Sequence, residues 1–416
     1  MTIPLSRNRE YRLLWTSQAL SEFGINSAMI AFPLLVLTVT GSPAASGLVL
    51  GAVAAARLVA GIPAGALVDR WNRKTIMLAC EVAQATAAAS LVAALWWNVA
   101  TIAHMVVVAI VLGICGALFE PAEDSILPNL VPEKQLSTAV SLNAARSYLG
   151  QLSGTGAGGF LFAIGRFVPF VVETVAHAIA FVELLFLRVP PREVRREPMS
   201  HLRHEMVAGL RWVWEQRYIR VFALCAISIN AFFTAYYIVV IVLAQTRGIP
   251  PGEIGVMAAM LGVGGILGAT IAPYLYRKLS PHVLIVMVFW VLTVLTPVAI
   301  VINSGYLMGV LFAAMALLTP SANTAITTRQ LLLTPDGMRG RLAGVMAVAT
   351  GVAAAVGPAL GGMLMEEVSG TVAVLICTAG MAVVSVLVTI SPTLRDFPEL
   401  VNVGSDTPNE KGPSDG

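Results

Sequence analysis

The sequence predicts an all-α integral membrane protein with twelve transmembrane helices in two pseudo-symmetric six-helix bundles. Three observations lead to this fold class: an apolar composition, twelve apolar stretches long enough to cross a bilayer, and a repeat that relates the two halves of the chain. Of the 416 residues, 57% are hydrophobic and only 12% are charged, and the mean hydropathy is +0.81. A water-soluble globule needs more polar surface than this composition supplies.

The apolar stretches set the number of helices. A bilayer core requires about 20 apolar residues per helix, and windows of that length occur twelve times along the chain. The predicted helices cover residues 12–39, 45–67, 75–97, 101–120, 138–164, 167–187, 219–244, 253–275, 282–302, 306–328, 341–365 and 370–391. The first stretch follows a basic N-terminus but has no small-residue cleavage site, so we expect a retained helix and not a signal peptide.

Basic residues predict the orientation of the chain. Under this topology, 21 of the 26 Lys and Arg residues fall on one side of the membrane, two fall on the other side, and three lie within helices. Loops rich in Lys and Arg stay in the cytoplasm. We therefore expect a multi-pass protein of the cell membrane with both termini in the cytoplasm. The net charge of +3 gives no sign of a nucleic-acid partner.

The two halves share a pattern at a constant offset of 203 residues. Pro132 is followed 22 residues later by Gly154, and Pro335 is followed 22 residues later by Gly357. Parallel halves of six helices with a substrate site at mid-membrane between them are an established transporter arrangement. The residues that the repeat assigns to helix packing are Gly154, Gly158, Gly159, Gly357, Pro358, Gly361 and Gly362.

We expect four parts in the chain: an N-terminal six-helix bundle over residues 1–188, a cytoplasmic linker over 189–218, a C-terminal six-helix bundle over 219–395, and a cytoplasmic tail over 396–416. In the linker, the spacing of Met206, Leu210, Val213 and Trp214 predicts an amphipathic surface helix. The tail is rich in Gly, Pro, Ser and Asp, a composition typical of disorder.

The most specific signal lies between the second and third apolar stretches, where residues 65–74 read Gly-Ala-Leu-Val-Asp-Arg-Trp-Asn-Arg-Lys. This short basic turn resembles the loop between helices 2 and 3 of the major facilitator superfamily, whose pattern is Gly-x-Leu-x-Asp-Arg-x-Gly-Arg-Lys. Asn72 departs from that pattern, because the family usually has Gly there. The resemblance implies that Asp69 braces the loop against helix ends of the other half. The residues of this conformational motif are Gly65, Asp69, Arg70, Arg73 and Lys74.

The loops that connect the helices narrow the resemblance to one branch of this superfamily. Residues 121–122 and 127–132 are similar to the stretch from helix 4 to helix 5 in the branch that holds macrolide efflux proteins, related multidrug exporters and the enterobactin exporter. Residues 329–330, 335–336 and 339–341 resemble the matching stretch of the second half, and the whole resemblance covers residues 7–395.

This resemblance implies a bacterial transporter that exports a drug-like or natural-product molecule, such as a macrolide or a siderophore, in exchange for protons. Alternating access of the two bundles is the mechanism implied. We expect a monomer in the lipid bilayer. Two alternatives stay open: a lipid or lysophospholipid translocator, and a membrane receptor or scaffold that transports nothing.

Two departures from the exporters of this superfamily affect the mechanism. Their helix 5 carries a Gly-x3-Gly-Pro-x2-Gly-Gly element, but Thr155 replaces the proline here, whereas the second half keeps Pro358. Close packing of helices explains such glycines equally well. Drug exporters with the helix 4 motif also have an arginine in mid-helix, and residues 104–116 contain none. Proton coupling must therefore use other residues.

Ionisable side chains inside the membrane are the candidates for coupling, because placing one in hydrocarbon costs several kcal/mol. Glu22 lies in the first helix and Glu173 in the outer part of the sixth. Arg57 and Arg146 are candidate counter-charges, and His177 shares a helix face with Glu173 at i+4. A static buried ion-pair network is the alternative. Four further glutamates lie near helix ends, where we expect solvated side chains: Glu81, Glu120, Glu123 and Glu183.

The seventh helix offers a face for the substrate. Asn230, Phe233 and Tyr237 lie on it at i, i+3 and i+7, and such a face suits a bulky amphipathic molecule, although core packing is the alternative. The sequence has no phosphate-binding Gly-Lys-Ser/Thr loop, so it gives no indication that ATP is the energy source. It also has no set of nucleophile, base and orienting group that would indicate an enzyme. The four cysteines lie in apolar stretches without metal-ligand spacing, so we expect no disulfide, no metal and no cofactor.

Overall fold

The structure is a computed structural model, and it describes residues 4–189, 211, 214–324, 326 and 336–391. Side chains are described for most of these residues, but not for Asp69. Most of the expected linker helix lies outside the described residues, because only Trp214 of its four apolar positions is included. The tail over 396–416 lies outside them as well.

The described residues form helices in both halves. The first half holds α1 (Arg9–Thr40), α2 (Pro43–Arg70), α3 (Arg73–Trp96), α4 (Ile102–Leu130), α5 (Glu133–Ile164) and α6 (Val168–Phe186). The second half holds α8 (Arg217–Thr246), α9 (Pro251–Lys278), α10 (Pro281–Leu295), the 3-10 helix η2 (Thr296–Ile300), α11 (Gly305–Ala316), α13 (Asp336–Glu367) and α14 (Gly370–Ile390). Each predicted transmembrane stretch falls on one of these elements, which confirms the all-α fold class.

Helix α4 extends well beyond its predicted bounds. The sequence predicts its end at residue 120, but the helix continues to Leu130 through Pro121 and Pro128. A window that counts apolar residues ends where polar residues begin, whereas the backbone stays helical beyond the apolar segment. Glu123 consequently lies on the helix and not in a loop.

Side-chain caps explain several helix starts and one departure in the loop motif. The side chain of Asn72 accepts a hydrogen bond from the backbone N–H of Thr75 at 3.3 Å and so caps the N-terminus of α3. Asn is among the residues that helix N-termini prefer at this position. Asn72 therefore performs a local structural task where the superfamily pattern has Gly. Asn8 and Ser42 cap α1 and α2 in the same way.

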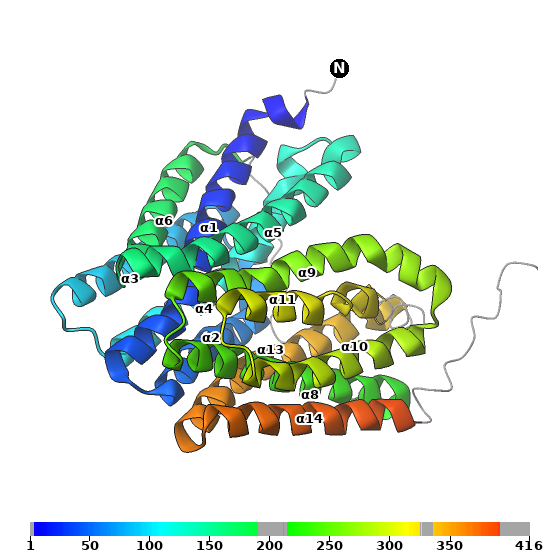
Figure 1. The fold of residues 1–416 in the computed structure, drawn as a ribbon. Coiled ribbons are helices and arrows are strands. Elements are labelled where there is room, and N and C mark those ends of the chain that lie inside the picture. Colours follow the sequence, from blue (N-terminus) through cyan, green and yellow to red (C-terminus); the bar gives the residue numbers. More distant parts are fainter. Residues whose placement is uncertain (1–3, 190–210, 212–213, 325, 327–335, 392–416) are drawn as a thin grey trace, which may run out of the picture.

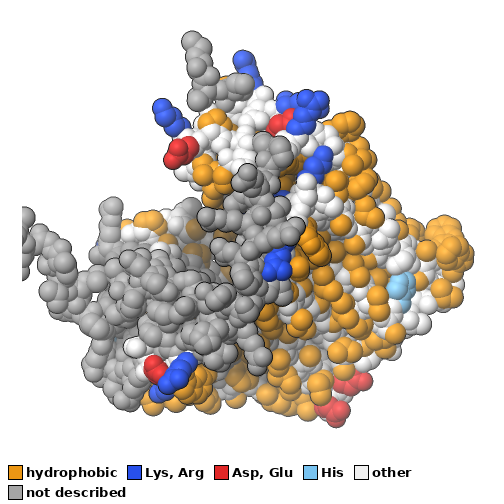
Figure 2. All heavy atoms as spheres, turned by 180° about the vertical axis from the view of Figure 1, so that it is seen from behind, with side chains coloured by type: hydrophobic (Ala, Val, Ile, Leu, Met, Phe, Trp, Pro, Cys, Tyr) orange, Lys and Arg blue, Asp and Glu red, His pale blue; other side chains and the backbone are white. Residues whose placement is uncertain are grey.

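The surface is consistent with a lipid environment. Eleven helical stretches among the described residues are long and apolar enough to cross a membrane. Helix α5 is not one of the eleven, and it lies against α1 on one side and α9 on the other. Figure 2 shows hydrophobic side chains over most of the described surface on one face, with Lys and Arg gathered towards one edge. The protein is thus a multi-pass membrane protein.

The two halves repeat one packing order. In the first half, α2 packs on α4, α4 on α3, α3 on α6, α6 on α1 and α1 on α5. The second half repeats this order with α9, α11, α10, α14, α8 and α13. The two sets of helices meet where α2 packs on α13 and where α5 packs on α9, and Figure 1 shows them as an upper left and a lower right group.

Contacts between the halves gather at one end of the helices. We call the end where α1 stops and α2 begins the closed end, and the opposite end the open end. At the closed end, Gly47 packs against Gly362 and Gly159 packs against Gly255, and in each pair a Cβ would meet the facing helix backbone. Towards the open end, a Cβ on Gly61 or Gly344 would meet nothing within 4 Å among the described residues. Among the described residues, the halves therefore touch at the closed end, and these glycines show no contact between the halves towards the open end.

Gly159 and Gly156 lie one turn apart on α5 and provide a test of this contact. A Cβ on Gly159 would collide with the carbonyl oxygen of Pro251, whereas a Cβ on Gly156 would meet the Ala259 side chain at an ordinary 3.6 Å. Overpacking at such a site costs about 1–3 kcal/mol. We expect Gly159→Ala to lower the thermal unfolding midpoint of the purified protein, while Gly156→Ala leaves it within a degree or two of wild type. Equal midpoints for both variants would contradict the described contact.

Candidate functional site

Among the described residues, the charged side chains deep in the membrane segments belong to the first half. In the described second half, Asp, Glu, Lys, Arg and His lie only within the first or last two turns of the helices. The first half instead carries three groups deeper in its helices. They involve Arg146 with Glu22 and Glu123, Arg57 with Glu120, and His177 with Glu81. The two halves therefore differ in chemistry although they share one fold.

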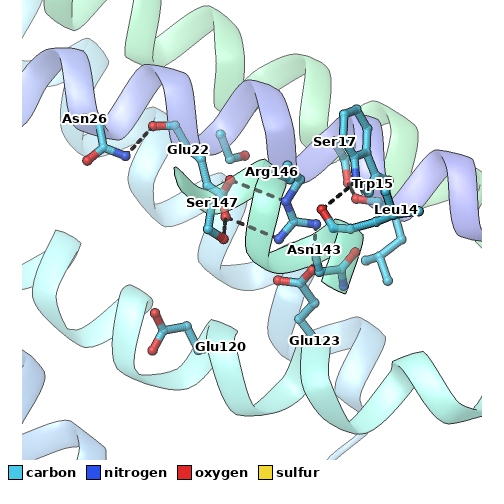
Figure 3. Close-up of polar contacts among 12 residues, drawn as sticks. Leu14, Trp15, Ser17, Glu22, Asn26, Glu120, Glu123, Asn143, Arg146 and Ser147 are labelled. Atoms are coloured by element: carbon cyan, nitrogen blue, oxygen red, sulfur yellow. Dashed lines mark hydrogen bonds and ion pairs between the residues drawn. The ribbon is translucent and has the colours of Figure 1, made fainter. Parts of the chain in front are cut away.

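Arg146 is the centre of the largest group, drawn in Figure 3. Its side chain on α5 is only 3% exposed, and Nε and Nη2 donate to the two carboxylate oxygens of Glu22 at 3.3 and 3.2 Å. On its other side, Nη1 lies 2.8 Å from Oε1 of Glu123 on α4 in an ion pair without hydrogen-bond geometry. Ser147 Oγ donates to Glu22 at 2.6 Å. One cation is thus shared by two carboxylates.

Glycines bring α1 and α5 close enough for this pairing. Arg146, Gly150, Gly154 and Gly158 follow one another at intervals of four residues and share a face of α5. A Cβ on Gly150 would meet Glu22, and a Cβ on Gly154 or Gly158 would meet the α1 backbone. The same face therefore brings α1 close and directs Arg146 towards Glu22.

The glycines and proline that the repeat assigns to packing do pack. Gly154 and Gly158 contact α1, and their counterparts Gly357 and Gly361 contact α8. Gly159, Gly362 and Pro358 contact the opposite half.

Arg57 and Glu120 form a separate, exposed pair. Arg57 Nη2 donates to Glu120 Oε1, and the two side chains are 52% and 65% exposed. On α2, the exposed apolar side chains of Leu48 and Val59 lie about 160–180° around the helix from Arg57, at 100° per residue. Those apolar residues suit the lipid, so Arg57 lies on the side turned towards the interior of the protein. Arg57 pairs with neither Glu22 nor Glu173 in this structure.

A third group lies where α1, α3 and α6 meet. His177 Nδ1 lies 2.6 Å from Oε2 of Glu81, and Ser21 Oγ donates to both oxygens of Glu81 at 3.0 and 3.2 Å. Glu173 lies one turn from His177, is completely buried, and has no hydrogen-bond partner on either carboxyl oxygen. His177 thus pairs with Glu81 and not with Glu173.

The expectation of solvated side chains at Glu81 and Glu123 is wrong. Glu81 is 0% exposed and Glu123 is 8% exposed. Position along a helix indicates depth in the membrane, but the neighbouring helices decide whether a side chain meets water. Glu120 is exposed as expected, and Glu183 accepts a hydrogen bond from Thr16.

The aromatic face expected on α8 is partly used for packing. Tyr237 stacks on Phe312 of α11 with ring centroids 6.0 Å apart, and Phe233 lies 6.5 Å from Tyr236 in a tilted arrangement. Both Phe233 and Tyr237 are half-buried, whereas Asn230 is exposed. This face of α8 therefore presents two half-buried aromatic rings beside the exposed amide of Asn230.

The loop motif ties helices of the first half together. Arg73 Nη1 donates to the carbonyl of Ser125 at 2.6 Å, and Lys74 Nζ donates to the carbonyls of Leu185 and Leu187 at 2.8 and 2.7 Å. A cation at the C-terminus of α6 is favourable because unpaired helix carbonyls gather there. Arg70 ends α2, and Gly65 is exposed within it. The contacts of Asp69 lie outside the described side chains.

Two repeated six-helix halves with buried charges in one of them define a transporter of the major facilitator fold. Among solved structures, the nucleoside transporter NupG aligns with a TM-score of 0.75 over 93% of this chain and 99% of its own, at 11% identity. That degree of identity supports the fold alone.

The chain belongs to the major facilitator family described as transmembrane secretion effectors, which matches residues 2–411. It is 26% identical over 394 residues to the multidrug efflux pump Tap of Mycolicibacterium fortuitum, which covers 90% of this chain and 93% of that protein. It is also 24% identical over 127 residues to macrolide efflux protein A of Enterococcus faecalis, across 30% of this chain and 39% of that protein. The predicted superfamily and branch are confirmed.

Proposed function

We propose that the protein is a proton-coupled efflux transporter that exports a drug-like or natural-product molecule, such as a macrolide or a siderophore. The single observation that carries the coupling is the position of Arg146 between two carboxylates. With Glu22 and Glu123 ionised, the group holds one net negative charge inside the membrane. Binding one proton makes it neutral, so the group can hold one proton without adding an unpaired charge to a buried site. The efflux relatives named above support the direction of transport.

Alternating access of the two halves is the proposed mechanism. The contacts between the halves at the closed end fit one of its two end states. We propose that residues 1–188 and 219–395 move as the two bundles and that the loop motif with Asp69 stabilises the opposite state. In this proposal, the first half binds the protons, and its residues for this task are Glu22, Arg146, Glu173 and His177. Asn230, Phe233 and Tyr237 belong to the half that offers apolar and aromatic contacts to the cargo.

Transport in proteoliposomes tests this proposal. The purified protein is reconstituted, a pH gradient is imposed with the lumen acidic, and uptake of ethidium or erythromycin is followed together with the lumenal pH. Uptake against the cargo gradient, with proton release from the vesicles, supports antiport. Movement of a fluorescent lysophospholipid alone would favour the lipid translocator, and a chain that moves none of these probes would contradict transport of this kind.

We further propose a monomer in a bacterial cell membrane with both termini in the cytoplasm, which places the open end on the cytoplasmic side. Asn303 is exposed beside the start of α11, and Asn72 is exposed beside the start of α3 at the opposite end. In a chain with its four cysteines replaced by alanine, Asn303→Cys is expected to react with an impermeant maleimide from outside intact cells. Asn72→Cys is expected to react only after the cells are permeabilised. Labelling of Asn72→Cys in intact cells would reverse the orientation.

A further inference from the structure

The group at the meeting of α1, α3 and α6 is separate from the Arg146 group. Glu22 turns towards α5, whereas Ser21, its neighbour on α1, turns towards α3 and donates to Glu81. The described ion pairs and hydrogen bonds of the two groups share no residue. The two groups are therefore held on different faces of α1.

The surroundings of this second group supply no compensating cation among the described side chains. From α1, Ser21 donates to Glu81, and the buried Gln18 lies one turn before Ser21 on the same helix. From α3, Cys80 and Gln84 lie beside Glu81. The thiol of Cys115 on α4 lies against that of Cys80. The titratable groups are thus two carboxyls, one imidazole and two thiols.

Glu173 and His177 each have unused hydrogen-bonding capacity. Among the described residues, neither carboxyl oxygen of Glu173 has a hydrogen-bond partner, and Nε2 of His177 has none either. Glu173 is 0% exposed and His177 is 1% exposed. Burying a carboxylate without a partner is costly, so the proton transfer proposed for this group starts from a neutral Glu173 carboxyl. Residues at i and i+4 of a helix are neighbours, so rotation of the Glu173 side chain brings its carboxyl within reach of His177 Nε2.

We propose that Glu173, His177 and Glu81 form a second proton-binding site, which gives the transporter two coupled protons in each cycle. The inference rests on the proposed proton coupling and assigns to Glu81 a role that its sequence position does not indicate. The O–H bond of Glu173 breaks and an N–H bond forms at His177 Nε2. The resulting imidazolium donates its Nδ1–H to the Glu81 carboxylate, which Ser21 also stabilises. The charge of the group is −1 before and after this transfer, so the transfer adds no net charge to the buried site.

The proposed site can bind and move a proton, which distinguishes it from a static ion pair. An imidazole can accept a proton at Nε2 while its Nδ1–H donates to a carboxylate. Glu81 and Ser21 lie on the Nδ1 side of His177, and Glu173 lies one turn away on the same helix. A movement of α6 against α1 therefore shifts the proton between Glu173 and His177, because Gly24 of α1 lies directly against the Glu173 backbone.

An infrared pH titration of the purified protein tests the site without any cargo. We expect a protonated carboxyl band that Glu173→Gln removes, and we expect the pH dependence of that band to vanish in His177→Gln or Glu81→Gln. Glu183→Gln is the matched control, since Glu183 lies on the same helix and pairs with Thr16 instead. A band with wild-type pH dependence in both His177→Gln and Glu81→Gln, or no band that Glu173→Gln removes, would overturn the site. Both variants are measured because, if one of them does not fold, the other still tests the site.

Proton counting in proteoliposomes tests the stoichiometry with ethidium as the probe and the membrane potential clamped. We expect two protons per ethidium for wild type and for the control Glu183→Gln, and one for Glu81→Gln and His177→Gln. The loss of one proton lowers the limiting accumulation about tenfold for each unit of the pH gradient. Ethidium movement by wild type without proton flux would refute the proposed coupling, whereas unchanged counts in both variants would refute only the second site. The infrared titration decides on the site if ethidium is not carried.

Discussion

Glu22→Gln is expected to remove the proton of the Arg146 group from the transport cycle, and so to lower uphill accumulation of cargo, while leaving cargo binding and downhill exchange intact. The glutamine keeps the shape of the side chain and a hydrogen-bond acceptor for Arg146, but it carries no charge. Arg146 and Glu123 then form a neutral pair, which imitates the proton-loaded group. The cycle turns over in this state without moving a proton through the Arg146 group. We expect the limiting accumulation ratio in proteoliposomes to fall about tenfold for each unit of the pH gradient, because one of the two coupled protons is lost.

Two further variants separate coupling from folding. Ser147→Ala removes only the 2.6 Å hydrogen bond to Glu22 and keeps all three ionisable groups, so it is expected to retain uphill transport with a shifted pH optimum. Arg146→Gln leaves two buried carboxylates without their cation, and breaking such a pair costs about 3–5 kcal/mol. We therefore expect low expression of Arg146→Gln. A well-folded Glu22→Gln protein that concentrates cargo with unchanged pH dependence would show that the group is structural.

The fold follows closely from the sequence because its determinants are local. Apolar length sets each membrane helix, Lys and Arg indicate its direction, and the offset of 203 residues indicates two like halves. The structure repeats one packing order of six helices in both halves, as this repeat requires. The extension of α4 to Leu130 could not be predicted in this way, because a hydropathy window does not detect helical residues beyond an apolar segment.

The candidate site could be predicted only in part from the sequence. Which charged side chains pair depends on the rotation of each helix about its axis. The sequence offers Arg57 and Arg146 equally as counter-charges, and the structure pairs Arg146 with Glu22 and Arg57 with Glu120. One pattern in the sequence does favour Arg146, since it continues at i−4 the row of Gly150 and Gly154. A cation in line with a row of small residues lies on the face that meets another helix.

No comparable pattern marks Glu81. Its neighbours on α3 are a cysteine and a valine, and its pairing depends on α1 and α6 packing against α3 from both sides. Ser21 and Glu81 are 60 residues apart in the sequence, and Glu81 and His177 are 96 residues apart, so only tertiary packing brings them together. A buried acid of this kind becomes visible only once the bundle is assembled.

The contact between the halves at the closed end is expected to break in every transport cycle. Glu366 at the end of α13 accepts hydrogen bonds from Ser42 Oγ at 2.6 Å and from the Ala44 backbone N–H at 3.0 Å. Its carboxylate thus caps the N-terminus of α2 from the opposite half, where helix N–H groups lack partners. Glu366 is exposed, so solvent weakens these hydrogen bonds. A contact of this kind stabilises one state and still yields to the free energy of a proton gradient.

Bridging this contact is therefore expected to stop turnover. With Ser42→Cys and Glu366→Cys in a chain without other cysteines, a short bifunctional methanethiosulfonate reagent should reduce transport to the level of empty vesicles, and a reductant should restore it. The single-cysteine variants treated with the same reagent are the controls, because they carry the modification without the link. The expectation follows from geometry, since α2 and α13 must separate at Ser42 before the closed end can open. Full transport by the bridged protein would show that the two halves do not move apart there and would exclude alternating access at this end.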